Sequence, residues 1–394
     1  MELLGKSKEE LREICVAMGE PAYRGGQIYH ALYAERKFAF SEMTNLPASL
    51  RERLAKEATI TLPVVKQRFA SIDGSVRYLF ELSGAEREGV SPETTEDAKD
   101  REKTQKKRRL KAASVEAVFM PSEGRQTICI STQAGCAVDC QFCLTAQLGL
   151  IRNLTAGEIV AQVLVTLEED RRARIVKGEG QDAGLKPGAT QSRTQTNVVL
   201  MGQGEPLLNF DAVMAALRIM LDPAGIGIAP RHATLSTSGI VPGIERLTME
   251  KVRPKLAISL NASSDEQREA LMPINKKYPL SVLLEACKKF PRGSREYLTF
   301  EYVLLGGVND SPEDARRVAK LMSDLGRVKV NLIPWNPGAL PFAEPTAERV
   351  SEFHRILLEK GVPVFTRYSR GRDVMAACGQ LALTQIEGSV VDGE

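Results

Sequence analysis

A regular alternation of strand-like and helix-like segments constrains the fold of this chain more than any other feature. Short runs rich in β-branched residues recur from residue 126 onward, and stretches with helical periodicity fill the gaps between them. Strand–helix units of this kind make successive strands parallel through crossover connections. We therefore expect an α/β fold with a parallel sheet, open or curled into a barrel. The expected strands are 126–131, 196–202, 232–238, 255–260, 297–305, 327–333 and 362–367.

Local signals mark two helix starts and one interruption in this region. Thr155 and Glu158 form a capping box ahead of a long apolar-periodic stretch, and Ser311 precedes a proline suited to the first helical position. The segment 175–196 is rich in Gly, Gln and Thr and poor in apolar residues, which favours an insertion loop.

The chain before residue 126 is organised differently. Its first 60 residues show helical spacing, with basic residues that indicate either a solvated helix face or a phosphate-contacting surface. Residues 64–82 predict two strands joined at Asp73-Gly74, and 115–121 predicts another strand. Between them, 91–111 is too charged to support a core. The expected units are 1–60, a hairpin and linker over 61–122, a barrel over 123–370, and a carboxyl-terminal segment over 371–394.

Composition narrows the setting in which the chain works. No apolar run approaches the roughly 18 to 20 residues that span a bilayer, and the amino terminus lacks a secretory apolar region. We expect a cytoplasmic protein without a membrane partner, in which thiols stay reduced. The net charge of +3 is too small to indicate a nucleic-acid partner by itself.

Three of the seven cysteines form a compact array. Cys136, Cys140 and Cys143 are spaced Cx3Cx2C directly after the first expected barrel strand. A structural zinc site normally needs four ligands, and no histidine lies nearby. Three thiolates suit an iron–sulfur cube in which one iron is left open for a substrate or cofactor. An incomplete zinc site, a chance grouping and a thioredoxin-like Cx2C are the alternatives.

A second segment, VVLMGQGEPLLN, places two glycines and Glu205 after an expected strand. Glycines there let the backbone approach a ligand closely, and a carboxylate can accept hydrogen bonds from an ammonium group. The alternative is a tight turn with a solvated glutamate.

These motifs resemble the radical S-adenosylmethionine superfamily, in which an aromatic residue, here Phe142, precedes the last cysteine. The resemblance implies a partial (βα)6 barrel and a [4Fe-4S] cluster held by the three cysteines. It also implies that S-adenosylmethionine binds the open iron and is cleaved to a 5′-deoxyadenosyl radical. The residues that it implies as cofactor contacts are Gly204, Glu205, Ser236, Ser259, Leu260, Asn261 and Asn336.

More specifically, most of the chain is similar to the RlmN family, through motifs that include STQAGCAVDCQFC, LMPINKKYPL, NLIPWNP and AACGQL. That resemblance implies methylation of adenine C2 in 23S rRNA and tRNA, with two S-adenosylmethionine molecules per turnover. Cys378 would carry the methyl group, Glu116 would accept the C2 proton, and Cys129 would resolve the adduct by forming a disulfide. The implied partners are the two RNAs and an electron donor such as flavodoxin or ferredoxin, with a monomeric enzyme.

Two residues depart from the family pattern. Gln203 replaces a methionine common between the two glycines, and Asn261 occupies a position often held by histidine. Both departures lie near the expected cofactor and suggest an altered cofactor affinity. The alternatives are the sister family that methylates adenine C8, and an iron–sulfur electron carrier or RNA-binding scaffold. A carrier or a scaffold would give Cys378 and Glu116 no purpose.

Overall fold

The computed structural model describes residues 1–82, 114–176, 194–294 and 296–381. The predicted insertion at 91–111 lies outside the described residues, as does most of the one at 175–196. The two remaining lone cysteines, Cys15 and Cys287, are buried, as expected for small apolar side chains.

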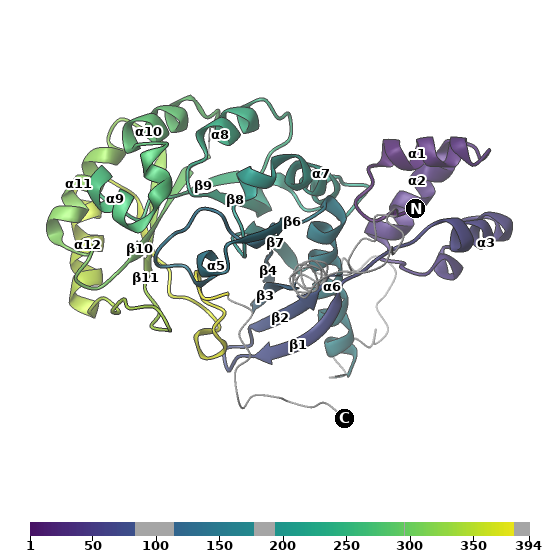
Figure 1. Cartoon of the computed structure of the whole chain (residues 1–394), viewed down its shortest axis with the longest axis horizontal. Coiled ribbons are helices and arrows are strands. Elements are labelled where there is room, and N and C mark those ends of the chain that lie inside the picture. The colour runs from purple at the N-terminus through teal and green to yellow at the C-terminus, as the bar shows by residue number, and fades with distance from the viewer. Residues whose placement is uncertain (83–113, 177–193, 295, 382–394) are drawn as a thin grey trace, which may run out of the picture.

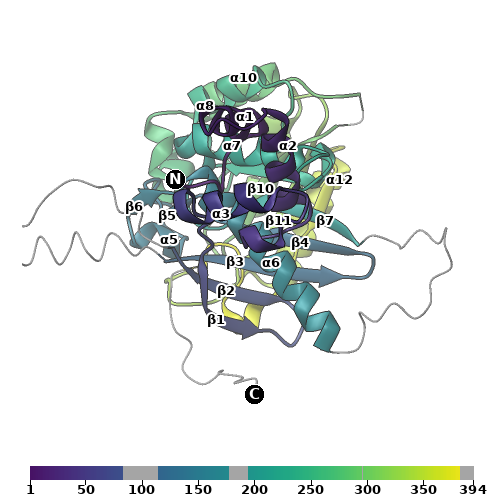
Figure 2. The same cartoon turned by 90° about the vertical axis from the view of Figure 1, so that its right-hand side faces the viewer.

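The amino-terminal unit is helical, as predicted, and stands at one end of the molecule (Figure 1). Leu11, Leu32 and Leu50 are buried, which shows that its helices pack through their apolar faces. Turned by 90°, the molecule has these helices in front of the barrel (Figure 2). The helices are α1 (Lys8–Ala17), α2 (Tyr23–Tyr29) and α3 (Ala48–Glu57), with a π-helical turn at His30–Ala34.

The parallel sheet predicted from the alternating pattern is confirmed. Within the described residues, seven strands pair in parallel, and each expected strand is found within two residues of its predicted bounds. Helical crossovers connect them over the outer face, giving the partial (βα)6 barrel and one further strand. In sheet order the strands are β4 (Arg125–Cys129), β7 (Gln195–Leu200), β8 (Ala233–Thr237), β9 (Lys255–Ser259), β10 (Leu298–Leu304), β11 (Val328–Pro334) and β12 (Val364–Thr366).

Both predicted capping signals are present at helix starts. The Thr155 hydroxyl accepts from the Glu158 amide (3.2 Å), while the Glu158 carboxylate accepts from the Thr155 amide (2.8 Å). Ser311 caps its helix in the same way. The crossover helices are α6 (Ala156–Val176), α7 (Phe210–Leu221), α8 (Val241–Thr248), α9 (Asp265–Leu271), α10 (Leu280–Lys289), α11 (Pro312–Met322) and α12 (Ala347–Glu359).

The predicted hairpin is part of the same sheet as the barrel. Strands β1 (Val64–Ala70), β2 (Val76–Glu81) and β3 (Ser114–Ser122) pair antiparallel in sequence order, and β3 pairs with β4. The hairpin connection is longer than the expected two-residue turn, since residues 71–75 link the strands, with Gly74 at a φ of +80°. The ten-stranded sheet therefore runs from β1 to β12.

A small second sheet lies where the cysteine array begins. Strands β5 (Gln133–Gly135) and β6 (Leu150–Asn153) pair antiparallel around the short helix α5 (Leu144–Gln147). Across the described residues, none of the helices is long and apolar enough to cross a membrane.

Candidate active site

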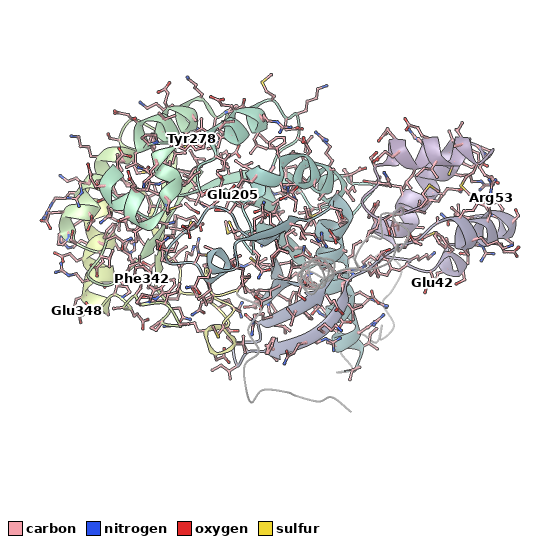
Figure 3. All side chains as sticks on the ribbon, viewed as in Figure 1. Glu42, Arg53, Glu205, Tyr278, Phe342 and Glu348 are labelled. Atoms are coloured by element: carbon pink, nitrogen blue, oxygen red, sulfur yellow. The ribbon has the colours of Figure 1, made fainter. Side chains whose placement is uncertain are left out.

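A cavity of about 870 Å³, open space at its mouth included, lies at the carboxyl ends of the parallel strands. We refer to it as the first cavity. Strands β7 to β11 and the cysteine loop supply its lining, so residues far apart in sequence meet there. Glu205, one of its lining residues, is labelled inside the barrel in Figure 3, away from Glu42 and Arg53 of the amino-terminal unit.

The three array cysteines line this cavity together, on the loop between β5 and α5. The Cys136 amide donates to the Gly149 carbonyl (3.0 Å), which closes the loop at its base. Gly135 precedes it at a φ of +72°, and a Cβ there would lie only 1.8 Å from the Gly149 oxygen. Only glycine fits that position, so Gly135 is required for the loop to begin there.

Burial governs the protonation of these thiols. It raises the pKa of Cys136 to about 12, and raises the pKa values of Cys140 and Cys143 as well. Thiols in such surroundings stay protonated at neutral pH unless a cation stabilises the thiolates. A cationic metal centre bound here would therefore have to displace the thiol protons and stabilise the thiolates.

The donor set of the array, three soft thiols on one cavity, fits an iron–sulfur centre. In the described part of the chain, no group of three or more His, Cys, Asp or Glu side chains could hold a metal ion as the side chains stand. An iron–sulfur cube binds each thiolate at a different iron, so its ligands surround a volume instead of meeting at one point. Three thiols on one cavity wall fit that requirement.

Arg268 supports the wall of the first cavity, and no sequence motif had pointed to it. Its side chain is completely buried and donates to the carbonyl oxygens of Ser238 (2.6 Å), Ser259 (3.2 Å) and Leu260 (3.2 Å). Burial lowers the pKa of Arg268 to about 10, so it remains a cation at neutral pH. Through these three hydrogen bonds, Arg268 links the carboxyl ends of β8 and β9.

Glu205 is held by donors from the next strand. Its carboxylate accepts from the Ser238 amide and hydroxyl, both at 2.7 Å, and from the Leu207 amide (3.0 Å). Burial nevertheless raises the pKa of Glu205. Gly204 has a φ of +95° and passes so close to Gln133 that a Cβ would lie 2.5 Å from it. An ammonium group in the cavity would favour the charged carboxylate, which fits the amino group of S-adenosylmethionine.

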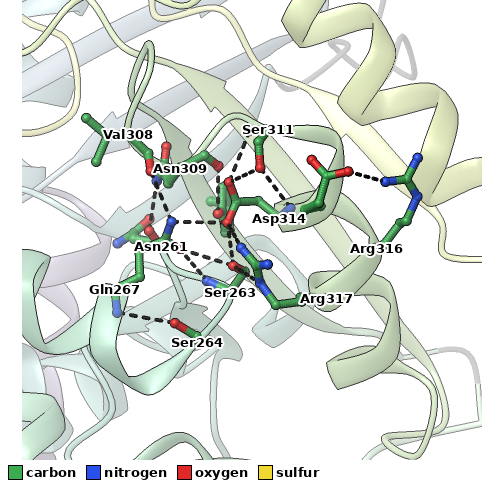
Figure 4. Close-up of polar contacts among 12 residues, drawn as sticks. Asn261, Ser263, Ser264, Gln267, Val308, Asn309, Ser311, Asp314, Arg316 and Arg317 are labelled. Carbon is green, nitrogen blue, oxygen red and sulfur yellow. Dashed lines mark hydrogen bonds and ion pairs between the residues drawn. The ribbon is translucent and has the colours of Figure 1, made fainter.

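Three more predicted cofactor residues line the first cavity: Ser236, Ser259 and Asn261. The hydroxyls of Ser236 and Ser259 lie 3.4 Å apart. Asn261 has a φ of +55°, and its side-chain oxygen accepts from the Val303 amide (2.9 Å). Asn309 donates to the Asn261 carbonyl (2.8 Å), within the polar network drawn in Figure 4. The residue that departs from the family pattern thus supports the cavity wall.

Two predicted cofactor residues lie outside this lining. Leu260 is buried in the core, and its backbone oxygen accepts from Arg268. Asn336 uses its amide to donate to Gln380 (2.8 Å) and to accept from the Arg372 guanidinium. Its contacts are with the carboxyl-terminal segment that carries Cys378.

A second cavity of about 800 Å³ adjoins the first, and two basic residues, Arg367 and Arg370, are among its lining residues. Cys129 lines this second cavity, whereas Cys378 lines both. Cys378 is exposed as a residue, and it lines both cavities. The residues that line both cavities are Cys143, Thr145, Met201, Gly202, Ile333, Cys378 and Gly379.

Surrounding protein keeps both of these thiols neutral. Although Cys378 exposes surface, the protein atoms packed around it withdraw its sulfur from bulk water, and this desolvation, with smaller contributions from Glu301 and Cys143, raises the pKa of Cys378 to about 12. Burial also raises the pKa of Cys129, and the nearby Cys378 adds to that effect. The two cysteines are therefore close enough to influence each other, although they are 249 positions apart in the sequence.

Glu116 is completely buried and is not among the residues that line either cavity. It lies on β3 two residues from Val118, which pairs with Cys129 across the sheet and lines that cavity. Arg77 forms a fully buried ion pair with Glu116, and Gln203 donates to the same carboxylate at 3.5 Å. Arg77 packs over the Phe69 ring at 4.0 Å. The sequence had not singled out Arg77.

The partial barrel carries the three-cysteine loop and the Gly204-Glu205 turn at the carboxyl ends of its strands. This combination defines the class of radical S-adenosylmethionine enzymes. The Radical SAM superfamily model matches residues 189–322. A radical SAM methyltransferase from Sphaerobacter thermophilus has a similar structure, with a TM-score of 0.81 and 38% identity over 97% of this chain and 99% of that one.

The particular family follows from the whole chain. The model of the ribosomal RNA large subunit methyltransferase N-terminal domain matches residues 1–60. The probable dual-specificity RNA methyltransferase RlmN of Koribacter versatilis (strain Ellin345) is 45% identical, over 94% of this chain and 98% of that protein. The RlmN of Anaeromyxobacter sp. (strain Fw109-5) is 43% identical, over 95% and 88%. This chain belongs to the RlmN family.

Proposed function

We propose that this protein methylates C2 of an adenine in 23S rRNA and in tRNA, with Cys378 as the methyl carrier. One observation carries the proposal: Cys378 lies on the wall shared by two cavities. The first holds the thiols and the carboxylate suited to a cluster and S-adenosylmethionine. The second is lined by Cys129 and by Arg367 and Arg370, whose positive charge suits a nucleotide phosphate.

In the first cavity, the chain's own residues bind and orient. Cys136, Cys140 and Cys143 would hold a [4Fe-4S] cluster, and Gly204 and Glu205 would hold the cofactor's amino group. When bound, the cluster and two S-adenosylmethionine molecules per turnover supply the methyl group and the radical chemistry. The apolar Phe142 beside the thiols limits access of water.

In the second cavity, the residues act on the RNA base. Adenine must leave its stack to expose C2 to Cys378. Once the carrier carbon is bonded to C2, Glu116 removes the C2 proton. The Cys129 thiolate then attacks the Cys378 sulfur and displaces the carbon, which gains a proton to become the methyl group. Because the carbon would reach C2 as a radical, one unpaired electron is left on the base, and the oxidised cluster would accept it. An external donor such as flavodoxin or ferredoxin would reduce the disulfide after each turnover.

The test is mass spectrometry of RNA nucleosides from a strain that lacks the gene. We expect 2-methyladenosine to disappear from both rRNA and tRNA, and to return when the wild-type gene is restored. Restoration with Cys378→Ala should leave it absent. Loss of 8-methyladenosine with 2-methyladenosine intact would instead support the C8 chemistry of the sister family.

A further inference from the structure

The segment that carries Cys378 leaves the sheet and crosses to the hairpin. After β12 ends at Thr366, residues 370–373 lie against the β1–β2 connection at 71–75. Figures 1 and 2 both show this carboxyl-terminal segment in yellow beside the tips of β1 and β2. A hairpin near the amino terminus therefore contacts a segment about three hundred residues later.

Two aspartates make this contact reciprocal. Asp73, on the hairpin, accepts from the Gly371 amide (3.0 Å), and its backbone oxygen accepts from the Arg370 guanidinium (2.7 Å). Asp373, on the segment, accepts from the Ser71 hydroxyl (2.6 Å) and the Ile72 amide (3.1 Å). Each side thus supplies a carboxylate to a backbone amide of the other, and we call the arrangement the aspartate clasp.

The electrostatics of the clasp show that both carboxylates work in their charged form. Burial alone would raise the pKa of Asp73, but hydrogen bonds from Gly371, Ser75 and Ser71 hold it well below its usual range. The hydrogen bond from Ser71 is the main cause of the lowered pKa of Asp373. Charge-assisted hydrogen bonds are about twice as strong as neutral ones.

The backbone of the segment needs outside support. Gly371 (φ +62°) and Met375 (φ +52°) both adopt the left-handed region, which is unfavourable for methionine. Beyond Cys378, the Gly379 carbonyl accepts from the Leu144 amide (2.8 Å), and the Leu381 carbonyl accepts from Thr145 (2.6 Å). Cys378 is therefore held between two anchors, of which the clasp is the upstream one.

We infer that Asp73 and Asp373 are positioning residues that set where Cys378 stands between the two cavities. The inference rests on the proposed role of Cys378 as methyl carrier. The same sulfur must react with the cofactor in one cavity and with adenine in the other, so both steps depend on its position. A misplacement of about 1 Å can reduce a rate about a hundredfold. Loss of the clasp should therefore slow turnover roughly tenfold to a hundredfold, without changing the affinity for RNA.

The experiment uses the cluster-loaded full-length enzyme with three variants, Asp73→Asn, Asp373→Asn and the double variant. Glu81→Gln is the matched control, because it removes an exposed ion pair with Lys66 at the other end of the same hairpin. Four quantities are measured: hydrogen exchange of residues 370–378, methylation of Cys378 by intact mass, kcat and KM for RNA methylation, and cluster absorbance.

We expect faster hydrogen exchange, slower Cys378 methylation and a lower kcat in each single variant, with KM, cluster absorbance and the control unchanged. The double variant should be no slower than the slower single variant, because both changes open one clasp. Unchanged exchange and rates in both single variants would overturn the inference, as would rate losses that merely follow lost cluster absorbance. A wild-type enzyme that transfers no methyl group to RNA would refute the proposed function, while the exchange data would still test the clasp.

Discussion

Cys129 and Cys378 are each a lone cysteine in the sequence, yet in the fold they line one cavity. Their proposed roles differ, because only Cys378 also faces the cluster side. Cys129→Ala removes the thiol that cleaves the carbon–sulfur bond but leaves the carrier in place. We expect protein to remain covalently attached to RNA, since water is a poor nucleophile toward sulfur. Denaturing electrophoresis with labelled RNA should show a nuclease-sensitive shifted band.

The control for that experiment is the doubly substituted Cys129→Ala, Cys378→Ala variant, which lacks the carrier and should give no shifted band. Normal turnover by Cys129→Ala without any adduct would mean that Cys129 is only a strand residue. Another group would then have to release the product.

The raised pKa of Cys378 predicts an unusual reactivity profile in the cluster-free protein. Alkylation requires the thiolate, and with a pKa of about 12 the thiolate fraction grows about tenfold per pH unit through the alkaline range. The rate with an uncharged alkylating reagent should therefore still be rising near pH 10, where an ordinary thiol has levelled off. Peptide mass mapping follows the rate at Cys378, and a plateau near pH 9 would show that burial does not control this thiol.

At the scale of single residues, the sequence predicted those that stand in a recognisable short motif and missed those whose role depends on partners far away in the chain. The cysteine array, Glu205 and Cys378 stood in short motifs, and all line the first cavity. Arg77 and Arg268 carried no such signal, because burial of an arginine depends on distant partners such as Glu116 on another strand. Leu260 and Asn336 are also predicted cofactor contacts; they lie outside the lining of the first cavity, and the contacts described above join them to other parts of the protein.

Among the elements, strands and capped helices followed from the sequence because period and capping are local properties. Strand β9 was expected at 255–260 and is found at Lys255–Ser259. The contact between the β1–β2 connection and residues 370–373 was beyond prediction, because hydrogen bonds between segments so far apart leave no periodic pattern. The hairpin was expected, but its place in the barrel sheet was not.

The capping box of α6 gives a prediction at the scale of one element. Thr155→Ala removes the acceptor for the Glu158 amide at the start of the helix. We expect a loss of about 1 kcal/mol in the free energy of unfolding, measured by urea titration. Thr155→Ser keeps the hydroxyl and should retain most of the stability. Equal losses in the two variants would mean that the threonine methyl group, and not the cap, stabilises the helix.

For the whole molecule, the amino-terminal helices and the barrel share one hydrophobic core that extends from Leu3 to Val364. Gly5 and Gly157 on α6 form a close backbone contact between the two parts, where a Cβ on Gly157 would lie 2.6 Å from the Leu4 oxygen. Alanine normally stabilises a helix relative to glycine by roughly 0.5–1 kcal/mol. Gly157→Ala should instead destabilise the protein by about 1–3 kcal/mol, because the added methyl group forces the two parts apart.

Gly26 on α2 supplies the matched comparison, because a Cβ there would meet only the flexible Lys8 side chain at 3.3 Å. Gly26→Ala should leave the thermal midpoint unchanged or raise it, whereas Gly157→Ala should lower it. Calorimetry of the wild type should show one cooperative transition. A stabilised Gly157→Ala variant would mean that the helical unit is not docked on α6 as the contacts indicate.

The ten-stranded sheet begins at β1 and ends at β12 without closing on itself in the described part of the chain. A closed barrel of eight strands has an interior only wide enough to be filled by its own side chains. An open sheet is not limited in this way, and here two adjoining cavities share Cys378 in their linings. In the proposed reaction, this arrangement would place one sulfur atom between the cofactor and the nucleobase.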